Sequence, residues 1–182
     1  LKINRDLREA NYQKVVEVCR NTDPKMHWQG DFLRLPKSAT RAKFADHRIY
    51  MYKGGEIDRQ VHMGIDLASV AHSPIPAANT GIVIFAEFLG IYGKTVILDH
   101  GFGLFSMYSH LSHIGVEVGD HLAKGDILGR TGITGLAGGD HLHFSMLIHD
   151  TFVNPVEWWD TNWIQHNVLS KIEQAGSGIK QE

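Results

Sequence analysis

Short apolar runs separated by glycine-bearing turns dominate the chain from about residue 47 to residue 150. The runs RIYMY, GIVIFAEFL, KTVILDHG and LFSMYSHL are rich in β-branched and aromatic residues. This pattern predicts short strands joined by turns, and no stretch between them has the length and period of a helix. We therefore expect a mainly β fold, with an antiparallel sheet or a small barrel-like domain.

The segment VEVGDHLAKGDILGRTG contains a different turn signal, a repeated Gly-Asp pair. The pairs Gly119-Asp120 and Gly125-Asp126 interrupt very short apolar runs at a spacing of six residues. Glycine followed by aspartate favours a tight turn. The segment therefore predicts brief strands in a compact, strongly bent sheet.

Helical spacing is confined to the two ends of the chain. Residues 5–20 place apolar side chains at loosely helical intervals, and the turn-rich segment after them predicts a connection. Near the other end, Asn154 is a good N-cap and Pro155 suits the first helical position. We expect a helix from there, flanking the sheet, and a frayed tail over residues 175–182. The expected packing stripe comprises Val156, Trp159, Trp163, Val168 and Ile172.

These patterns divide the chain into three parts. Residues 1–40 form an N-terminal helix and connecting segment, residues 41–157 form the central domain, and residues 158–182 form a C-terminal helix and tail.

Composition and charge narrow the classes of partner. The 182 residues are 43% hydrophobic and 21% charged, as in an ordinary globular domain. A net charge of −2 argues against nucleic acid as a partner, and no apolar run is long enough to cross a bilayer. The chain starts at Leu1 rather than Met and shows no signal peptide. We therefore expect it to be part of a longer chain whose upstream region carries an export signal or a membrane anchor.

Twelve histidines are a heavy load for a chain of this size, whereas Cys19 is the only cysteine. A single cysteine excludes an internal disulfide and a cysteine-rich zinc site. In HMGIDLA, His62 and Asp66 have H-x-x-x-D spacing, and we expect Gly64 between them to let the backbone turn tightly. Imidazole and carboxylate together are ligands that zinc accepts.

Two further stretches hold histidines in suggestive places. In GGDHLHFSM, His141 and His143 stand two apart, so on a strand both leave the same face. In YSHLSH, His110 ends a strand-like run, and Tyr108 would share its face, either lining the site or packing in the core. We expect His100 at a turn or groove edge.

A catalytic zinc site usually has three protein ligands and an open fourth position. His62, Asp66 and one histidine of the 141/143 pair would complete such a site. The other histidine of the pair, with His110, would be free for proton transfer. Each motif alone also fits a structural role; their joint occurrence favours one site.

The motifs HMGIDLA, YSHLSH and GDHLHFSM, in this order, closely resemble those of the LytM/lysostaphin-type zinc endopeptidases, which cleave peptide cross-links of bacterial cell walls. The resemblance covers about residues 44–157 and implies an antiparallel β fold with one zinc per chain on the floor of a groove. It implies His62, Asp66 and His143 as zinc ligands, and His110 and His141 as catalytic histidines that do not bind the metal.

The same resemblance implies a substrate and a location. The partners would be peptidoglycan stem peptides and their cross-links, with the D-alanyl–diaminopimelate type favoured over glycine bridges. The enzyme would act outside the cytoplasm, in the periplasm or cell envelope of a bacterium.

Two departures from the family pattern precede the first ligand. The family often has Phe-Gly before an arginine near the start of the domain, where this chain has FADHR with Ala45. The stretch IYMYKGGEIDRQ also has its own character and would reshape the groove rim.

Two alternative interpretations are open. A non-catalytic LytM-like module that activates a separate cell-wall amidase would have lost its ligands, whereas here all five positions are present. An unrelated H-x-H amidohydrolase would require alternating strands and helices, which this pattern lacks. Measured zinc content separates the first alternative from an enzyme.

Overall fold

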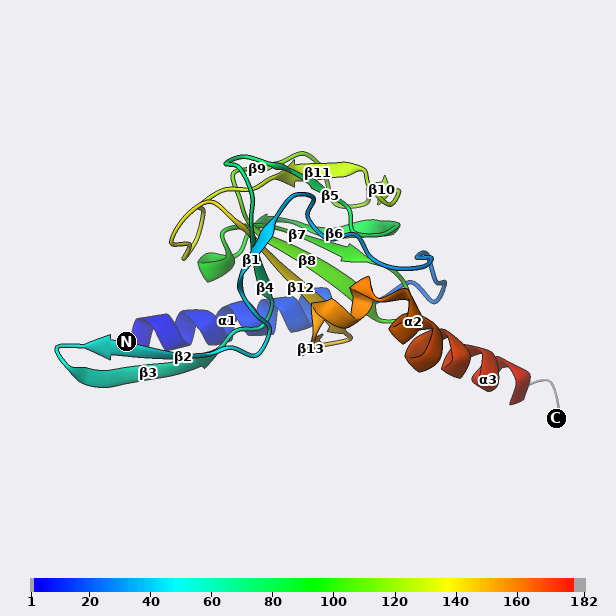
Figure 1. The fold of residues 1–182 in the computed structure, drawn as a ribbon, viewed down its shortest axis with the longest axis horizontal. Helices are drawn as coiled ribbons and strands as arrows, with labels where there is room; N and C mark the ends of the chain where they lie inside the picture. Colours follow the sequence, from blue (N-terminus) through cyan, green and yellow to red (C-terminus); the bar gives the residue numbers. More distant parts are fainter. Residues whose placement is uncertain (1, 179–182) are drawn as a thin grey trace.

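Antiparallel sheets lie between helices at the two ends of the chain in the computed structural model, which describes residues 2–178, with side chains from residue 5 to residue 175 (Figure 1). The largest sheet has eight strands in the order β1-β4-β12-β8-β7-β6-β10, with β13 paired to β12. Its strands are β1 (Ala39–Ala42), β4 (Ile65–Ala68), β6 (Gly81–Phe88), β7 (Lys94–Asp99), β8 (Leu104–Leu111), β10 (His121–Leu122), β12 (Leu142–Ile148) and β13 (Thr151–Val153).

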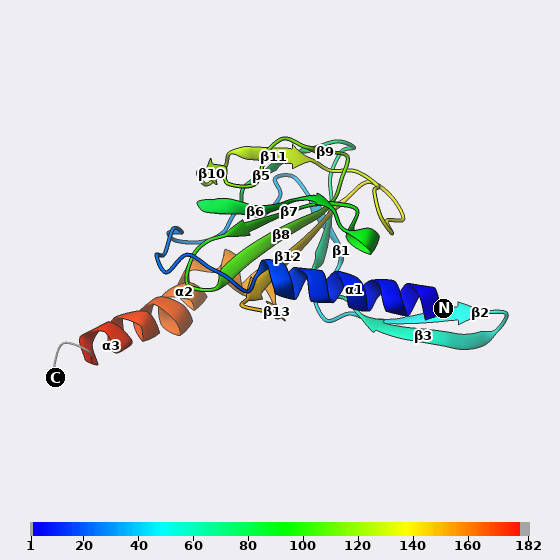
Figure 2. The ribbon, with the colours of Figure 1, turned by 180° about the vertical axis from the view of Figure 1, so that it is seen from behind.

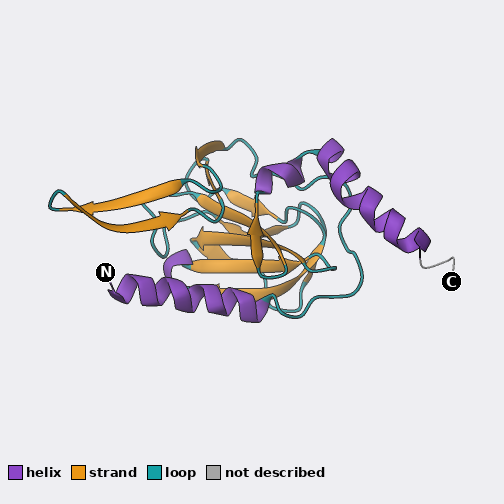
Figure 3. Ribbon diagram, turned by 90° about the horizontal axis from the view of Figure 1, so that it is seen from below, coloured by secondary structure: helices purple, strands orange, loops and turns teal. Residues whose placement is uncertain are grey.

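Two smaller sheets complete the fold. One has the order β5-β11-β9, with β5 (Pro74–Pro76), β9 (His113–Ile114) and β11 (Ile127–Arg130). The other is a hairpin of β2 (His47–Tyr52) and β3 (Gly55–Val61), which extends beyond the large sheet in the same direction as the N-terminal end of helix α1 (Lys2–Val18) (Figure 3). The predicted mainly β, antiparallel class with flanking helices is confirmed. Within residues 2–178, no helix is long and apolar enough to cross a membrane.

The two Gly-Asp pairs form the tight turns that the sequence predicts. Gly119 and Gly125 have φ values of 99° and 98°, in the left-handed region that glycine adopts without strain. Each following aspartate accepts a hydrogen bond from the backbone N–H three residues earlier, at 2.9 Å for Asp120 and 2.8 Å for Asp126. Both turns are therefore formed in the same way, by a left-handed glycine followed by an aspartate that accepts a backbone hydrogen bond.

Both faces of the large sheet are covered, so β8 is buried along its whole length. Phe105 and Met107 pack with Val15 and Cys19, because α1 lies across one face of the sheet (Figure 2). The opposite face packs against aromatic side chains of the turn-rich segment predicted to be a connection. That segment has no helix or strand up to β1, yet Trp28, Phe32 and Leu35 are all buried.

The C-terminal helix begins later than predicted. Asn154 caps only a short 3-10 helix, η2 (Pro155–Trp159), and the chain is extended again at Asp160. Asp160 accepts hydrogen bonds from the N–H groups of residues 162 and 163, at 2.9 and 3.1 Å, and so starts α2 (Thr161–Ile164). The helix continues through a π-helical segment, η3 (Gln165–Leu169), into α3 (Ser170–Gly178).

This break changes which side chains pack. Trp158 and Ile164 are buried, whereas Val156 and Ile172, two members of the predicted stripe, are exposed. The predicted tail is also wrong in part, because α3 continues to residue 178; residues 179–182 lie outside the described part of the chain.

A buried chain of hydrogen bonds corrects the prediction for His100 and decides between the two alternatives for Tyr108. His100 and Tyr108 are fully buried, on the sheet face away from α1. His100 Nδ1 lies 2.7 Å from the Thr80 carbonyl, and its Nε2 lies 2.7 Å from the Ser106 hydroxyl, which is 2.9 Å from the Tyr108 hydroxyl. Tyr108 in turn accepts from the Ala78 N–H at 2.8 Å. Both side chains therefore belong to the core rather than to a groove edge or a reactive site.

Candidate metal and catalytic site

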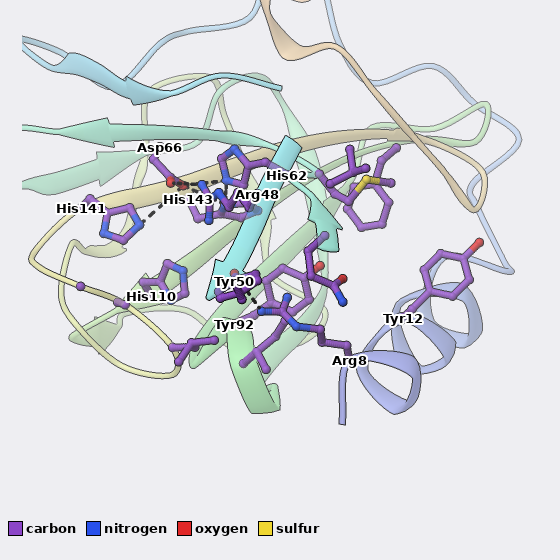
Figure 4. A pocket seen from close by; sticks show the side chains of 18 of the residues that line it. Arg8, Tyr12, Arg48, Tyr50, His62, Asp66, Tyr92, His110, His141 and His143 are labelled. Atoms are coloured by element: carbon purple, nitrogen blue, oxygen red, sulfur yellow. Dashed lines mark hydrogen bonds and ion pairs between the residues drawn. The ribbon is translucent and has the colours of Figure 1, made fainter. Parts of the chain in front are cut away.

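Strand pairing brings three of the five candidate residues to one point. His143 of β12 is directly opposite Asp66 of β4, and His62 lies in the loop just before β4. His143 Nδ1 is 2.9 Å from Asp66 Oδ1, and His62 Nε2 is 3.0 Å from each of these two atoms. Figure 4 shows the three side chains converging. All three are at most 13% exposed.

The partners of the far ring nitrogens fix where the ring protons sit. His62 Nδ1 is 2.8 Å from the Lys43 carbonyl, which has no hydrogen, so Nδ1–H must donate. Ser145 donates its hydroxyl to the Met63 carbonyl at 2.8 Å and therefore accepts from His143 Nε2–H at 3.1 Å. In the neutral rings, His62 Nε2 and His143 Nδ1 then carry lone pairs only, and they face each other and the Asp66 carboxylate.

Three acceptors meeting without a proton between them are an unfavourable arrangement unless a cation joins them. One ligand atom from each residue lies within 4.8 Å of the others, which is the grouping that a small divalent cation needs. Two neutral imidazoles and one carboxylate suit zinc in particular. The residues present therefore fit a zinc ion on their own chemistry.

Arg48 supports this cluster from β2. Its Nη2 lies 3.0 Å from Asp66 Oδ2, which leaves Oδ1 directed at the two histidines. Burial raises the pKa of Asp66, but hydrogen bonds from the surrounding histidines, His141 foremost, lower it by more whenever the facing nitrogen carries a proton, so the carboxyl is ionised. Contacts of this kind hold a ligand in its orientation.

Gly64 is required for a reason other than the predicted tight turn. It is not among the described glycines with positive φ. Instead, a Cβ at this position would lie 2.6 Å from the Phe144 carbonyl oxygen and 2.7 Å from His143 Nε2. The loop that carries His62 can approach β12 this closely only because residue 64 has no side chain.

His110 reaches the site through a β-bulge. Lys94 pairs with Leu111 and Val96 with Tyr108, so Ser109 and His110 together face one residue of β7. His110 has a φ of 64°, which is unusual for a residue with a side chain and breaks the alternation along β8. Tyr108 therefore packs in the core while His110 turns toward the metal cluster.

His110 and His141 form a second pair beside the cluster. Their ring centroids are 4.8 Å apart, and His110 is 5.8 Å from the ring of His143. His110 Nδ1–H donates to the Thr134 carbonyl at 2.9 Å, and His141 Nδ1–H donates to the Gly139 carbonyl at 2.7 Å. In both rings Nε2 is thus the nitrogen left for other chemistry; that of His141 lies 3.5 Å from Asp66 Oδ1.

The two rings differ in their readiness to take a proton. Burial lowers the pKa of His110 to about 4, so this ring is neutral at pH 7. Burial also lowers the pKa of His141, but the Asp66 carboxylate and the Gly139 carbonyl raise it by more, so the net shift is upward. His110 is 7% exposed, whereas the side chain of His141 is 15% exposed.

All five predicted residues line one cavity of about 700 Å³. Parts of its wall come from α1 and from the β2–β3 hairpin, including Arg8, Tyr12 and Tyr50 (Figure 4). Tyr50 belongs to the stretch IYMYKGGEIDRQ, which the sequence predicts to reshape the groove rim, whereas the sequence indicates no role for Arg8 or Tyr12. The alternation of His141, His143 and Ser145 along one strand would have pointed to Ser145. The sequence shows Arg48 only as the arginine of FADHR and gives no sign of its contact with Asp66, and it does not indicate Arg8 at all. Both reach the cavity through tertiary contacts.

A family model for peptidase family M23 matches residues 60–155. Among curated proteins, the chain is 35% identical over 97 residues to the DD-carboxypeptidase/endopeptidase Mpg of Neisseria meningitidis, a match that covers 53% of this chain and 22% of that protein. The matches span about a quarter of the length of the curated relatives.

Solved structures of similar fold include peptidase domains. A Pseudomonas aeruginosa structure described as a peptidase M23 superposes with a TM-score of 0.68 and 30% identity, over 87% of this chain and 61% of that one. The catalytic domain of lysostaphin from Staphylococcus simulans superposes with a TM-score of 0.59 and 24% identity, over 70% of this chain and 96% of that one.

Proposed function

This protein belongs to peptidase family M23, with a metallopeptidase domain of that family, and from this premise we propose that it is a zinc-dependent endopeptidase that hydrolyses peptide cross-links of bacterial peptidoglycan. The observation that carries the proposal is the meeting of two imidazole lone pairs and one carboxylate oxygen at the floor of a cavity that also holds two unligated histidines. The names of relatives such as the Neisseria endopeptidase support the substrate class.

His62, Asp66 and His143 are the proposed ligands of a single zinc ion. When bound, zinc would polarise the scissile carbonyl and lower the pKa of a water molecule to about 7. The chain's own part is to hold the three donors in place. The Lys43 carbonyl, Ser145 and Arg48 do this through the far ring nitrogens and the second carboxylate oxygen.

His110 and His141 are the proposed proton-transfer residues. Each donates its Nδ1–H to a backbone carbonyl, which fixes the ring and leaves Nε2 for proton transfer. Between them they would accept the proton of the attacking water and return one to the departing amine. The chain has no glutamate of an H-E-x-x-H motif for this task.

The proposed substrate bond is the D-alanyl–diaminopimelate cross-link. Such a substrate lies in the cell wall, so we propose that the enzyme acts outside the cytoplasm, in the periplasm or cell envelope. Fractionation of cells that express the full-length protein tests the location; recovery in the cytoplasmic fraction alone would contradict it.

The test of the assignment pairs zinc analysis with digestion of purified cell walls. His143→Ala should lose most of its zinc, because three ligands are the minimum for a stable catalytic site. His110→Ala and His141→Ala should keep zinc but lose about 10²–10⁴-fold in cleavage rate. The exposed His166, remote in sequence from these motifs, provides a matched control, and His166→Ala should change neither quantity.

Three results would contradict the proposal. Full zinc content in His143→Ala would remove it from the ligand set, and loss of zinc in His141→Ala would make His141 a ligand. A wild-type protein that purifies without stoichiometric zinc and releases no new amino terminus from any wall would favour the alternative, a binding module that activates an amidase.

A further inference from the structure

Arg8 is a cationic side chain in the cavity wall with an unmet hydrogen-bonding group. It extends from α1 toward Tyr50 and Tyr92 (Figure 4). Its Nε is buried and has no hydrogen-bond partner. Its one contact to another side-chain oxygen is a long one, 3.4 Å from Nη2 to the Tyr50 hydroxyl. A buried charged donor without an acceptor is costly, which points to an acceptor supplied by a ligand.

The other two arginines of the cavity wall already have acidic partners. Arg5 pairs with Asp58 at 2.9 Å, and Arg48 pairs with Asp66 at 3.0 Å. Glu9 also lines the cavity, but it accepts a hydrogen bond from the Gln13 amide at 2.8 Å. Among the side chains of residues 5–175, none forms an ion pair with Arg8, so its charge is available to an anion.

The position of Arg8 is fixed by the way α1 is anchored. Val15 is fully buried against the sheet, and Asn11 accepts the Ile91 N–H at 2.9 Å. Ile91 belongs to the 3-10 helix η1 (Gly90–Tyr92), which lies next to the cavity. Arg8 is one turn before Asn11 on a helix that cannot slide without losing these contacts, and its guanidinium lies against the Tyr50 ring, 5.9 Å from the ring centroid. The helix therefore presents this side chain to the cavity from a fixed backbone position.

We propose that Arg8 binds a free carboxylate of the peptide substrate, in the same cavity as the candidate metal centre. The inference rests on the proposed function and deepens it. A guanidinium presents a planar fork of donors that matches a carboxylate, and it stays charged at any working pH. The buried Nε would find its acceptor there, and the Tyr50 hydroxyl would contribute a further hydrogen bond.

This subsite bears on which cross-link is cut. A diaminopimelyl residue keeps a carboxylate on the carbon whose amine enters the cross-link. A glycine bridge has no free carboxylate along its length. An arginine held in the cavity therefore favours the diaminopimelate type, and it comes from a helix that precedes the matched family region, residues 60–155.

The experiment compares two synthetic D-alanyl–diaminopimelyl cross-linked peptides that differ at one group. In one peptide the carboxylate beside the cross-link amide is free, and in the other it is a carboxamide. The wild-type enzyme should prefer the free acid in kcat/KM by about tenfold or more, as expected for one charge-assisted hydrogen-bonded pair. Arg8→Gln should reduce this ratio to about one by slowing only the acid. The exposed Arg20, just beyond α1, provides the control, and Arg20→Gln should keep the wild-type ratio.

The carboxamide peptide also reports on the fold of each variant, because its cleavage does not use the proposed contact. An unchanged preference in Arg8→Gln would overturn the inference while the peptidase activity stands. An equal loss on both peptides would also overturn it, since Arg8 would then only support the structure. Cleavage of neither peptide by the wild-type enzyme would refute the proposed cross-link activity and this subsite together.

Discussion

Replacing Gly64 with alanine should damage the candidate metal centre without removing any of its proposed ligands. The new Cβ would lie 2.6 Å from the Phe144 carbonyl oxygen, 2.6 Å from Ser145 Oγ and 2.7 Å from His143 Nε2. Ordinary Cβ contacts begin near 3.4 Å, so loop and strand must separate by roughly 0.8 Å. The carbonyl belongs to β12, which is paired on both sides and cannot move freely.

Two measurable losses follow from that separation. Overpacking of this kind costs about 1–3 kcal/mol of unfolding free energy. The hydrogen bond between Ser145 and His143 Nε2 is also disturbed, and loss of such an outer contact weakens metal affinity by about 10–100-fold. We expect both effects in urea unfolding of the metal-free protein and in zinc titration against a competing chelator.

Gly55 is the matched control, because a Cβ there meets only the Tyr52 carbonyl at 3.8 Å and its φ is not positive. Gly55→Ala should change stability by less than about 0.5 kcal/mol and leave zinc affinity unchanged. Wild-type stability and zinc affinity in Gly64→Ala would refute the argument that this glycine exists to admit close approach.

Two further predictions concern stability. Burial holds the pKa of His100 near 4, against 6.5 in the unfolded chain, so the unfolded state takes up the proton first as pH falls. His100 should therefore lower the unfolding free energy between pH 6.5 and pH 4, by about 2 kcal/mol at pH 5 relative to pH 7.5. His100→Gln should remove this contribution and so reduce the slope in urea unfolding with chelator present. Ala45 has a φ of 63°, where glycine is unstrained, so Ala45→Gly should raise stability by about 0.5–1 kcal/mol. Ala86 lies in β6 and has no positive φ, so the control variant Ala86→Gly should lower stability. Both variants are compared by thermal or urea unfolding. A decrease in stability in Ala45→Gly as well would show that Ala45 is not strained.

The departure at Ala45 illustrates how the sequence and the structure explain each other. The sequence shows alanine where the resembled family often has glycine, and the structure shows a left-handed backbone there. Alanine adopts this backbone conformation only with strain, whereas glycine adopts it freely. The Ala45 N–H donates to the His62 carbonyl, so this left-handed turn contacts the backbone of a proposed ligand without supplying a ligand atom.

The sequence by itself determined the class of fold, the family resemblance and the five residues that gather in the cavity. Short apolar runs rich in β-branched and aromatic residues indicate strands, and the Gly-Asp pairs indicate turns, because both are local properties of the chain. The resemblance to LytM/lysostaphin-type enzymes is confirmed by the family match. The assignment of ligands and catalytic histidines stays a prediction until zinc and activity are measured.

Only the tertiary structure decided how those residues are placed and what surrounds them. The bulge that turns His110 away from the side of Tyr108 arises from the pairing of β7 with β8, and the close approach at Gly64 arises from the packing of a loop on β12. The burial of His100 and the delivery of Arg8 to the cavity depend on segments far away in sequence. The local pattern of polar and apolar residues does not predict contacts between segments that are distant in sequence. Desolvation and the convergence of side chains are properties of the assembled fold rather than of any short stretch of chain.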